Sequence, residues 1–140
     1  MSEVESIHTG RCLCGGVRYR VRGTLREVIT CHCTQCRQTS GHYVAASGAP
    51  TNTIELLCSD TLTWYASSAT AERGFCRRCG GNLFWRPLAN ERAWTSIMAG
   101  TLDPPTGLSV SQRIYVADKS DYYRLEDDIP HIDHIPHSRA

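Results

Sequence analysis

The chain of 140 residues has the size of one globular domain, with room for one hydrophobic core but not for two. Its formal net charge of +1 gives no electrostatic reason to expect nucleic acid or an anionic membrane as a partner. No stretch approaches the length of an apolar membrane span, and residues 1–11 contain no apolar run typical of a secretory leader. We therefore expect a cytoplasmic protein without nucleic-acid or membrane partners.

The first predicted element is a strand in which three apolar residues alternate with three arginines, the period of a strand with one buried and one solvated face. These residues are Val17, Arg18, Tyr19, Arg20, Val21 and Arg22. Further short runs rich in β-branched or aromatic residues follow, separated mostly by Gly, Pro, Asn or Asp. They cover residues 43–47, 53–57, 62–66, 94–99 and 113–117.

No long segment shows the 3.6-residue period of a helix, so we predict an all-β domain with at most a helical turn or two after Cys36. The cysteines would then lie on turns between short strands. The C-terminal residues 131–140 contain three histidines and Pro136 but little that a core could bury. We expect them to form a flexible tail.

Cysteine is the most informative residue type in the chain. Disulfides are disfavoured in a reducing compartment, so eight cysteines favour metal binding or catalysis, with disulfides as the alternative. Seven of them form three clusters, whereas Cys58 stands apart after an apolar run and is interpreted as a small buried hydrophobe. The clusters are Cys12 with Cys14, Cys31 with Cys33 and Cys36, and Cys76 with Cys79.

Seven cysteines do not divide into two sets of the four ligands that tetrahedral Zn²⁺ takes, so one ion would have three protein ligands unless a His or Cys58 completes it. A structural zinc is closed by four protein ligands, whereas a catalytic zinc keeps a position for water or substrate. Spacing alone leaves open which clusters pair. The central cluster is compact enough to hold one ion by itself, and on that division the two remote pairs would close the other.

The order and spacing of these motifs resemble the glutathione-dependent formaldehyde-activating (GFA) domain family over residues 10–130. The similarity rests on four segments: Gly10-x-Cys12-x-Cys14-Gly15-x-Val17-x-Tyr19; Cys31-His32-Cys33-x-x-Cys36-Arg37 with Gly41 after it; Phe75-Cys76-x-x-Cys79-Gly80; and Ala99-Gly100-Thr101-Leu102-Asp103. The resemblance implies a β-tent zinc fold with two zinc ions. It places a structural zinc on Cys12, Cys14, Cys76 and Cys79, and a second zinc on Cys31, Cys33 and Cys36.

The resemblance also implies an activity, the joining of glutathione and formaldehyde into S-hydroxymethylglutathione by a carbon–sulfur lyase running in reverse. Three thiolates make a zinc ion electron-rich, so the open site suits an incoming thiol, which loses its proton on coordination, better than it suits polarising a carbonyl. The catalytic residues would be the open zinc site of Cys31, Cys33 and Cys36. Two positions depart from many members of the family: Arg113 replaces His, and Tyr122 replaces Trp.

Arg37 adjoins the open site in sequence and is the preferred donor for a carboxylate of a glutathione-like thiol. His32 lies between two ligands, but alternation around a tight loop would point it away from the ion. The alternative to an enzyme is a non-catalytic zinc module that binds a thiol or a protein partner, with its fourth position closed by a side chain. An exchangeable fourth position would distinguish the enzyme from this module.

Overall fold

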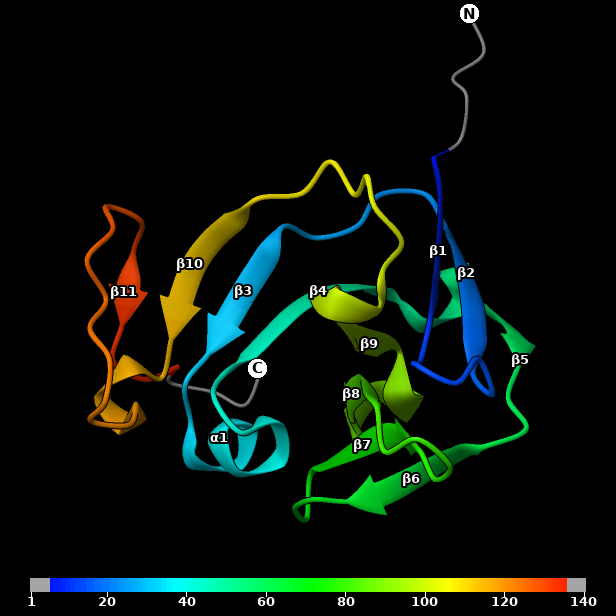
Figure 1. Cartoon of the computed structure of the whole chain (residues 1–140), viewed down its shortest axis with the longest axis horizontal. Coiled ribbons are helices and arrows are strands. Elements are labelled where there is room, and N and C mark those ends of the chain that lie inside the picture. The colour runs from blue at the N-terminus through cyan, green and yellow to red at the C-terminus, as the bar shows by residue number, and fades with distance from the viewer. Residues whose placement is uncertain (1–5, 136–140) are drawn as a thin grey trace, which may run out of the picture.

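The computed structural model describes residues 6–135, which form two β-sheets and one short α-helix joined by turns and loops (Figure 1). The strands are β1 (Ile7–Arg11), β2 (Arg18–Arg22), β3 (Val28–Cys31), β4 (Val44–Pro50), β5 (Ile54–Cys58), β6 (Leu62–Ala66), β7 (Ala71–Cys76), β8 (Asn82–Pro87), β9 (Trp94–Met98), β10 (Val110–Ile114) and β11 (His131–Ile132). The helix is α1 (Thr34–Ser40), and the 3₁₀ turns are η1 (Thr51–Thr53), η2 (Ala89–Arg92), η3 (Ala99–Thr101) and η4 (Val116–Asp118).

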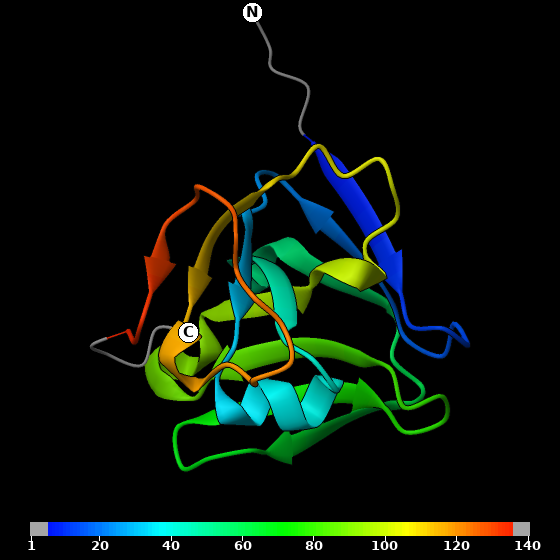
Figure 2. The ribbon, with the colours of Figure 1, turned by 60° about the vertical axis from the view of Figure 1, so that its left-hand side comes forward.

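The larger sheet has the strand order β11-β10-β3-β4-β9-β8-β7-β6, and the smaller sheet has the order β1-β2-β5. Neighbouring strands are antiparallel except that β10 runs parallel to β3 and β11. The large sheet bends strongly, so that β3 and β10 run across the direction of β6 and β7 (Figures 1 and 2). The helix α1 is held against β8 by a hydrogen bond from Asn82 Nδ2 to the carbonyl oxygen of Thr39 (2.8 Å).

The main hydrophobic core is built around β2 and the central strands of the large sheet. Val17, Tyr19 and Val21 are fully buried whereas Arg18 and Arg22 are exposed, which confirms the predicted alternation. The other buried members of this core are Cys12, Leu25, Ala49, Cys76, Leu83, Phe84, Ile97 and Leu102. Two cysteines therefore belong both to the core and to the predicted structural zinc site.

Gly10 allows a close approach between β1, β2 and the turn η3. A Cβ atom at this position would overlap the hydroxyl of Tyr19 and would lie 2.6 Å from the carbonyl oxygen of Thr101. That approach lets the Tyr19 hydroxyl form a hydrogen bond with Thr101 Oγ1 (2.6 Å). Gly10 and Tyr19 of the first motif segment and Thr101 of the last thus meet at one point.

We expect Gly10→Ala to lower the free energy of unfolding by about 1–3 kcal/mol, the usual cost of overpacking a well-packed region. Urea denaturation of variant and parent measures the difference. Gly100→Ala is the matched control, because a Cβ there meets no other atom within 4 Å. Equal stability of the two alanine variants would contradict the account of the motif glycine.

The all-β prediction is confirmed, and the run 62–66 coincides with β6. The runs 43–47, 53–57 and 94–99 match β4, β5 and β9 with shifted ends. The prediction for 113–117 is wrong in its second half, because Tyr115 adopts a φ of +55° and the chain turns into η4.

The helix begins at Thr34, before Cys36 rather than after it, and ends at Ser40, where the C-cap Gly41 adopts a φ of +87°. The sequence runs did not anticipate β1, β3, β7, β8 and β11. The strand β11 falls inside the segment for which we predict a flexible tail, and residues 136–140 of that segment lie outside the described part. Within residues 6–135, no helix has the length and apolar character needed to cross a bilayer.

Candidate metal centres and cavity

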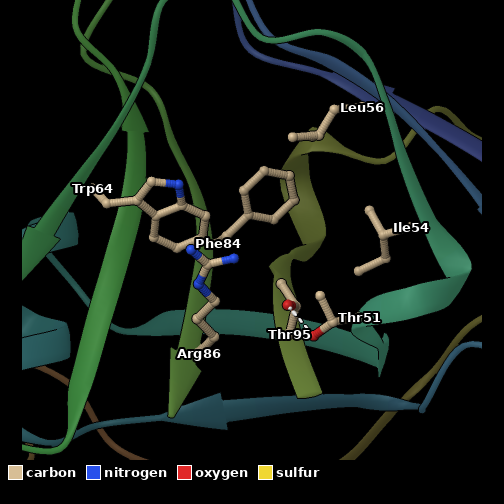
Figure 3. Close-up of a pocket in the computed structure, with 7 residues that line it drawn as sticks. All are labelled: Thr51, Ile54, Leu56, Trp64, Phe84, Arg86 and Thr95. Carbon is tan, nitrogen blue, oxygen red and sulfur yellow. Dashed lines mark hydrogen bonds between the residues drawn. The ribbon is translucent and has the colours of Figure 1, made fainter. Parts of the chain in front are cut away.

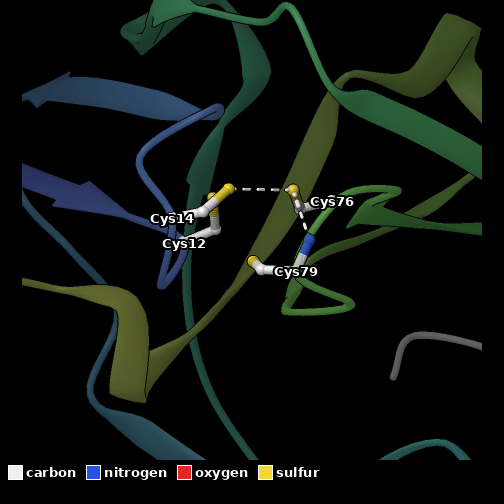
Figure 4. Close-up of side chains that lie close together, drawn as sticks. All are labelled: Cys12, Cys14, Cys76 and Cys79. Atoms are coloured by element: carbon white, nitrogen blue, oxygen red, sulfur yellow. Dashed lines mark hydrogen bonds between the residues drawn. The ribbon is translucent and has the colours of Figure 1, made fainter.

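Four cysteines from two distant segments meet at one end of the core (Figure 4). Cys12 and Cys14 lie in the loop between β1 and β2, Cys76 ends β7, and Cys79 lies in the turn to β8. Their four Sγ atoms all lie within 4.8 Å of one another. The group thus joins segments that are 62 residues apart at Cys14 and Cys76.

Hydrogen-bond donors surround these sulfur atoms. Cys76 Sγ accepts from the backbone N–H groups of Arg78 and Cys79 (3.3 Å each) and contacts Thr61 Oγ1 at 3.0 Å. Burial opposes ionisation of Cys76, but these donors lower its pKa to about 5. The Gly16 backbone and the Arg78 guanidinium, whose Nε lies 3.2 Å from Cys14 Sγ, lower the pKa of Cys14. The surroundings therefore favour thiolates at Cys14 and Cys76, whereas burial raises the pKa of Cys12.

This donor set fits a zinc ion. Four thiolates at about 2.3 Å from a tetrahedral ion would stand about 3.8 Å apart. The Sγ atom of Cys14 lies 3.8 Å from the Sγ atom of Cys12 and 3.5 Å from that of Cys76. The N–H groups that point at sulfur would orient the ligands and offset the negative charge of four thiolates.

The second group contains three cysteines around the start of α1. Cys31 ends β3, Cys33 is the N-cap of α1, and Cys36 lies in the first turn of the helix. Their Sγ atoms also lie within 4.8 Å of one another, and no other Cys, His, Asp or Glu of the described residues joins the group. Cys33 Sγ accepts a hydrogen bond from the backbone N–H of Cys36 (3.4 Å), so one thiol both caps the helix and faces the group.

The three thiols of this group do not ionise independently. Hydrogen bonds from Cys31 and Cys36 lower the pKa of Cys33 to about 2. The bond to Cys33, together with that to Cys36 and burial, raises the pKa of Cys31 well above its usual range. Without a metal, the group therefore holds one thiolate stabilised by its neighbours, and a divalent ion binding all three sulfurs would displace the remaining protons.

The three-cysteine group opens into a large cavity, to whose lining the four-cysteine group contributes no residue. The cavity has a volume of about 570 Å³, within the range of small-molecule sites. Its apolar wall includes Ile29, Val44, Trp85, Met98 and Ile114. Its polar lining includes Arg26, Gln35, Arg73, Gln112 and Asp118 together with the three cysteines.

The comparison with family models decides the family. Residues 7–118 match the model of the glutathione-dependent formaldehyde-activating enzymes, abbreviated GFA. The chain belongs to the GFA family. The predicted family membership is therefore confirmed, and the matched range includes both cysteine groups.

Two relatives place this GFA protein among known proteins. An uncharacterized lyase of Schizosaccharomyces pombe is 26% identical over 117 residues, which cover 83% of each chain. A crystal structure of a Rhodobacter sphaeroides protein matches with a TM-score of 0.58 and 22% identity, covering 88% of the GFA protein and 98% of that chain. The second similarity shows a shared fold.

His32 turns away from the three sulfur atoms of the GFA protein. Its side chain is fully buried and forms hydrogen bonds with Thr30 Oγ1 (2.8 Å) and the hydroxyl of Tyr123. Burial, helped by the charge of Arg113, lowers the pKa of His32 to about 4, so the ring is neutral near neutral pH. Both ring nitrogens are satisfied, and His32 acts as an anchor for the loop between two cysteines.

Arg37, His42 and Cys58 lie outside the cavity lining. Arg37 is half-buried on α1, and its Nε has no hydrogen-bond partner among the described residues. His42 contacts the Tyr122 hydroxyl (2.7 Å) at the surface. Cys58 is half-buried, and its Sγ donates to the carbonyl oxygen of Gly16 (3.3 Å) outside both sulfur groups.

A second, much smaller pocket lies on another face of the large sheet (Figure 3). Its volume is about 60 Å³, room for only a water molecule or two. Arg86 lies over the Trp64 ring at 3.6 Å from its centroid and pairs with Glu72 at 2.7 Å. The guanidinium of Arg86 is already paired with Glu72, and the pocket is too small for a substrate. This pocket is therefore not a candidate for a substrate site.

Sequence reasoning missed Arg73, which lies on β7 and lines the large cavity beside the cysteines. The departure at residue 113 also has a structural explanation. Arg113 pairs with Asp127 (2.6 Å) and donates to Thr30 Oγ1 (3.2 Å), and it is the next residues, Ile114 and Tyr115, that line the cavity.

Proposed function

We propose that the protein is a zinc-dependent carbon–sulfur lyase of the GFA type, which joins a glutathione-like thiol to formaldehyde or a related small aldehyde. The observation that carries this proposal is the position of the three-cysteine group in the wall of a cavity large enough for a tripeptide. The four-cysteine group would hold a structural zinc, since four protein sulfurs leave no position for a substrate. Membership in the GFA family and a relative named as a lyase support the reaction class.

When bound by Cys31, Cys33 and Cys36, zinc would supply an open fourth position at which an incoming thiol is deprotonated. The cavity walls would hold the thiol and the aldehyde together and keep most water out. The sulfur forms a bond to the carbonyl carbon, the π bond of the carbonyl breaks, and its oxygen takes up a proton. The product is an S-hydroxymethyl adduct, and the reverse sequence cleaves the same carbon–sulfur bond.

Exchange NMR with ¹³C-formaldehyde and glutathione tests the proposal, because it measures the rate of adduct formation at equilibrium against the uncatalysed background. We expect the zinc-loaded protein to accelerate exchange in proportion to its concentration. Exchange at the background rate, with glutathione still bound, would instead identify a non-catalytic zinc module that binds a thiol.

A further inference from the structure

Arg73 is an unusual arginine, because it is buried and poorly satisfied. Only 9% of its surface is exposed, although the residue lines the large cavity. Its Nε atom is buried and has no hydrogen-bond partner among the described residues. Its Nη2 atom has only long contacts, to Gln35 Oε1 (3.5 Å) and to Cys36 Sγ (3.7 Å).

A guanidinium in such a place is costly to bury unless an anion accompanies it. Within residues 6–135, no carboxylate lies within ion-pair distance of Arg73. Neighbouring Glu72 pairs instead with Arg86 and Arg92. Arg73 reaches the thiolates of the three-cysteine group only through one long contact, from Nη2 to Cys36 Sγ (3.7 Å). Its Nε donor has no partner among the described residues, so the acceptor that complements it is to be sought among molecules that enter the cavity.

We propose that Arg73 is the anchor for a carboxylate of the thiol substrate, so that the cavity selects carboxylate-bearing thiols. A guanidinium offers a planar fork of donors that matches the two oxygens of a carboxylate. The inference rests on the proposed function for the identity of the ligand as a thiol.

The position of Arg73 relative to the cysteines sets where the carboxylate lies. Its Nη2 contact to Cys36 Sγ places the guanidinium next to the three-cysteine group. A glutathione-like thiol held at that group would thus have to fold one carboxylate back toward its own sulfur, since its glycine carboxylate lies about six bonds from the sulfur along the chain. The other arginine in the lining, Arg26, donates to the carbonyl oxygens of Ala46 and Ser47 and already serves the fold.

Arg37, the donor expected from the sequence, is the natural comparison. Both arginines have a buried Nε without a partner among the described residues, but Arg73 alone of the two lines the cavity. The structure therefore favours Arg73, from a segment 36 residues later in the sequence, over the arginine that adjoins Cys36.

Titration calorimetry on the zinc-loaded protein tests the anchor with two probes, S-methylglutathione and its dimethyl ester. Both lack a free thiol, and they differ in the charge of the two carboxylates. We expect Arg73→Gln to weaken binding of the acid roughly 10- to 100-fold, the scale of losing hydrogen bonds to a charged group, and to leave the weaker binding of the ester unchanged. Arg73→Lys should restore part of the affinity, since it keeps the charge but not the fork.

Arg37→Gln is the comparison variant. Arg20→Gln is a surface control, because Arg20 on β2 pairs with Glu55 on β5 at the surface. The inference is overturned if the parent does not bind the acid at millimolar concentration. It is also overturned if Arg73→Gln binds the acid like the parent, if acid and ester lose affinity equally, or if Arg37→Gln alone shows the loss.

Thermal unfolding without ligand and zinc content separate this role from a structural one. Arg73 is not a metal ligand and has no carboxylate partner among the described residues, so Arg73→Gln should melt close to the parent with both zinc ions retained. A lower melting temperature with loss of a zinc ion would assign Arg73 to the metal site instead. The calorimetry is independent of catalysis, so the expected binding pattern in a protein that does not accelerate exchange would support the anchor while refuting the proposed reaction.

Discussion

The Cys76→Ser variant is expected to melt far below the parent or to be insoluble. Cys76 is fully buried and belongs to the core; its sulfur receives two backbone hydrogen bonds and forms a third with Thr61 Oγ1. Because a structural zinc site forms only in the folded chain, its binding free energy, of order 10 kcal/mol, is folding free energy. Losing one of four ligands should cost at least about 4 kcal/mol, or roughly 10–15 °C in melting temperature.

Cys58→Ser is the matched control for this variant. Cys58 is half-buried and lies outside both sulfur groups, so the same change of sulfur to oxygen should cost no more than about 1 kcal/mol. Scanning calorimetry with zinc analysis compares the three proteins. If Cys76→Ser melts like the parent and keeps its zinc, the four-cysteine group has no structural role.

The Cys33→Ala variant is expected to lose all adduct formation above the uncatalysed rate and yet to fold. Cys33 supplies one of only three sulfurs in the cavity group, so its loss leaves too few ligands for a stable ion. It also caps α1, and losing that cap should cost about 1 kcal/mol. The melting temperature should therefore fall by only a few degrees.

Cys33→Ser separates the two roles of this residue. A serine hydroxyl keeps an acceptor for the backbone N–H of Cys36 but supplies no thiolate for the metal. We expect Cys33→Ser to be as stable as the parent in thermal unfolding and as inactive as Cys33→Ala in exchange NMR. Adduct formation at the parent's rate in either variant would refute the assignment of the catalytic site to this group.

The sequence predicted best where one local pattern decides the structure. Val17, Tyr19 and Val21 alternate with arginines, and this local pattern alone indicates a strand with one buried and one solvated face. The strand β2 has that pattern of burial. The division of the cysteines followed from counting ligands and from the family resemblance. The structure brings together the same two groups of sulfur atoms, each compact enough for one ion.

The strands that sequence reasoning missed lack such a local pattern. In β7 a buried arginine and a glycine interrupt the apolar residues, and Gly74 lies against the Trp64 ring where a side chain would crowd it. The strand β3 is only four residues long. The end of β10 depends on the left-handed backbone of Tyr115, a conformation that residue type does not predict.

The cavity could not be predicted from the sequence, because its lining comes from residues spread between Arg26 and Ile135. Arg73 was missed for a related reason. Arginine is seldom buried, so a lone arginine in a strand is normally interpreted as a surface residue. Its burial becomes visible only when α1 and β7 are brought together by the fold.

Graded chelation, with metal content, melting temperature and exchange rate followed on one sample, distinguishes a catalytic zinc ion from a structural one. The first zinc ion should leave from Cys31, Cys33 and Cys36, because three ligands and an open position hold it less firmly than four ligands from two segments. Adduct formation should disappear with that first ion while the fold persists, and unfolding should follow loss of the second. Simultaneous loss of both ions with unfolding, or adduct formation that survives loss of the first ion, would contradict the account.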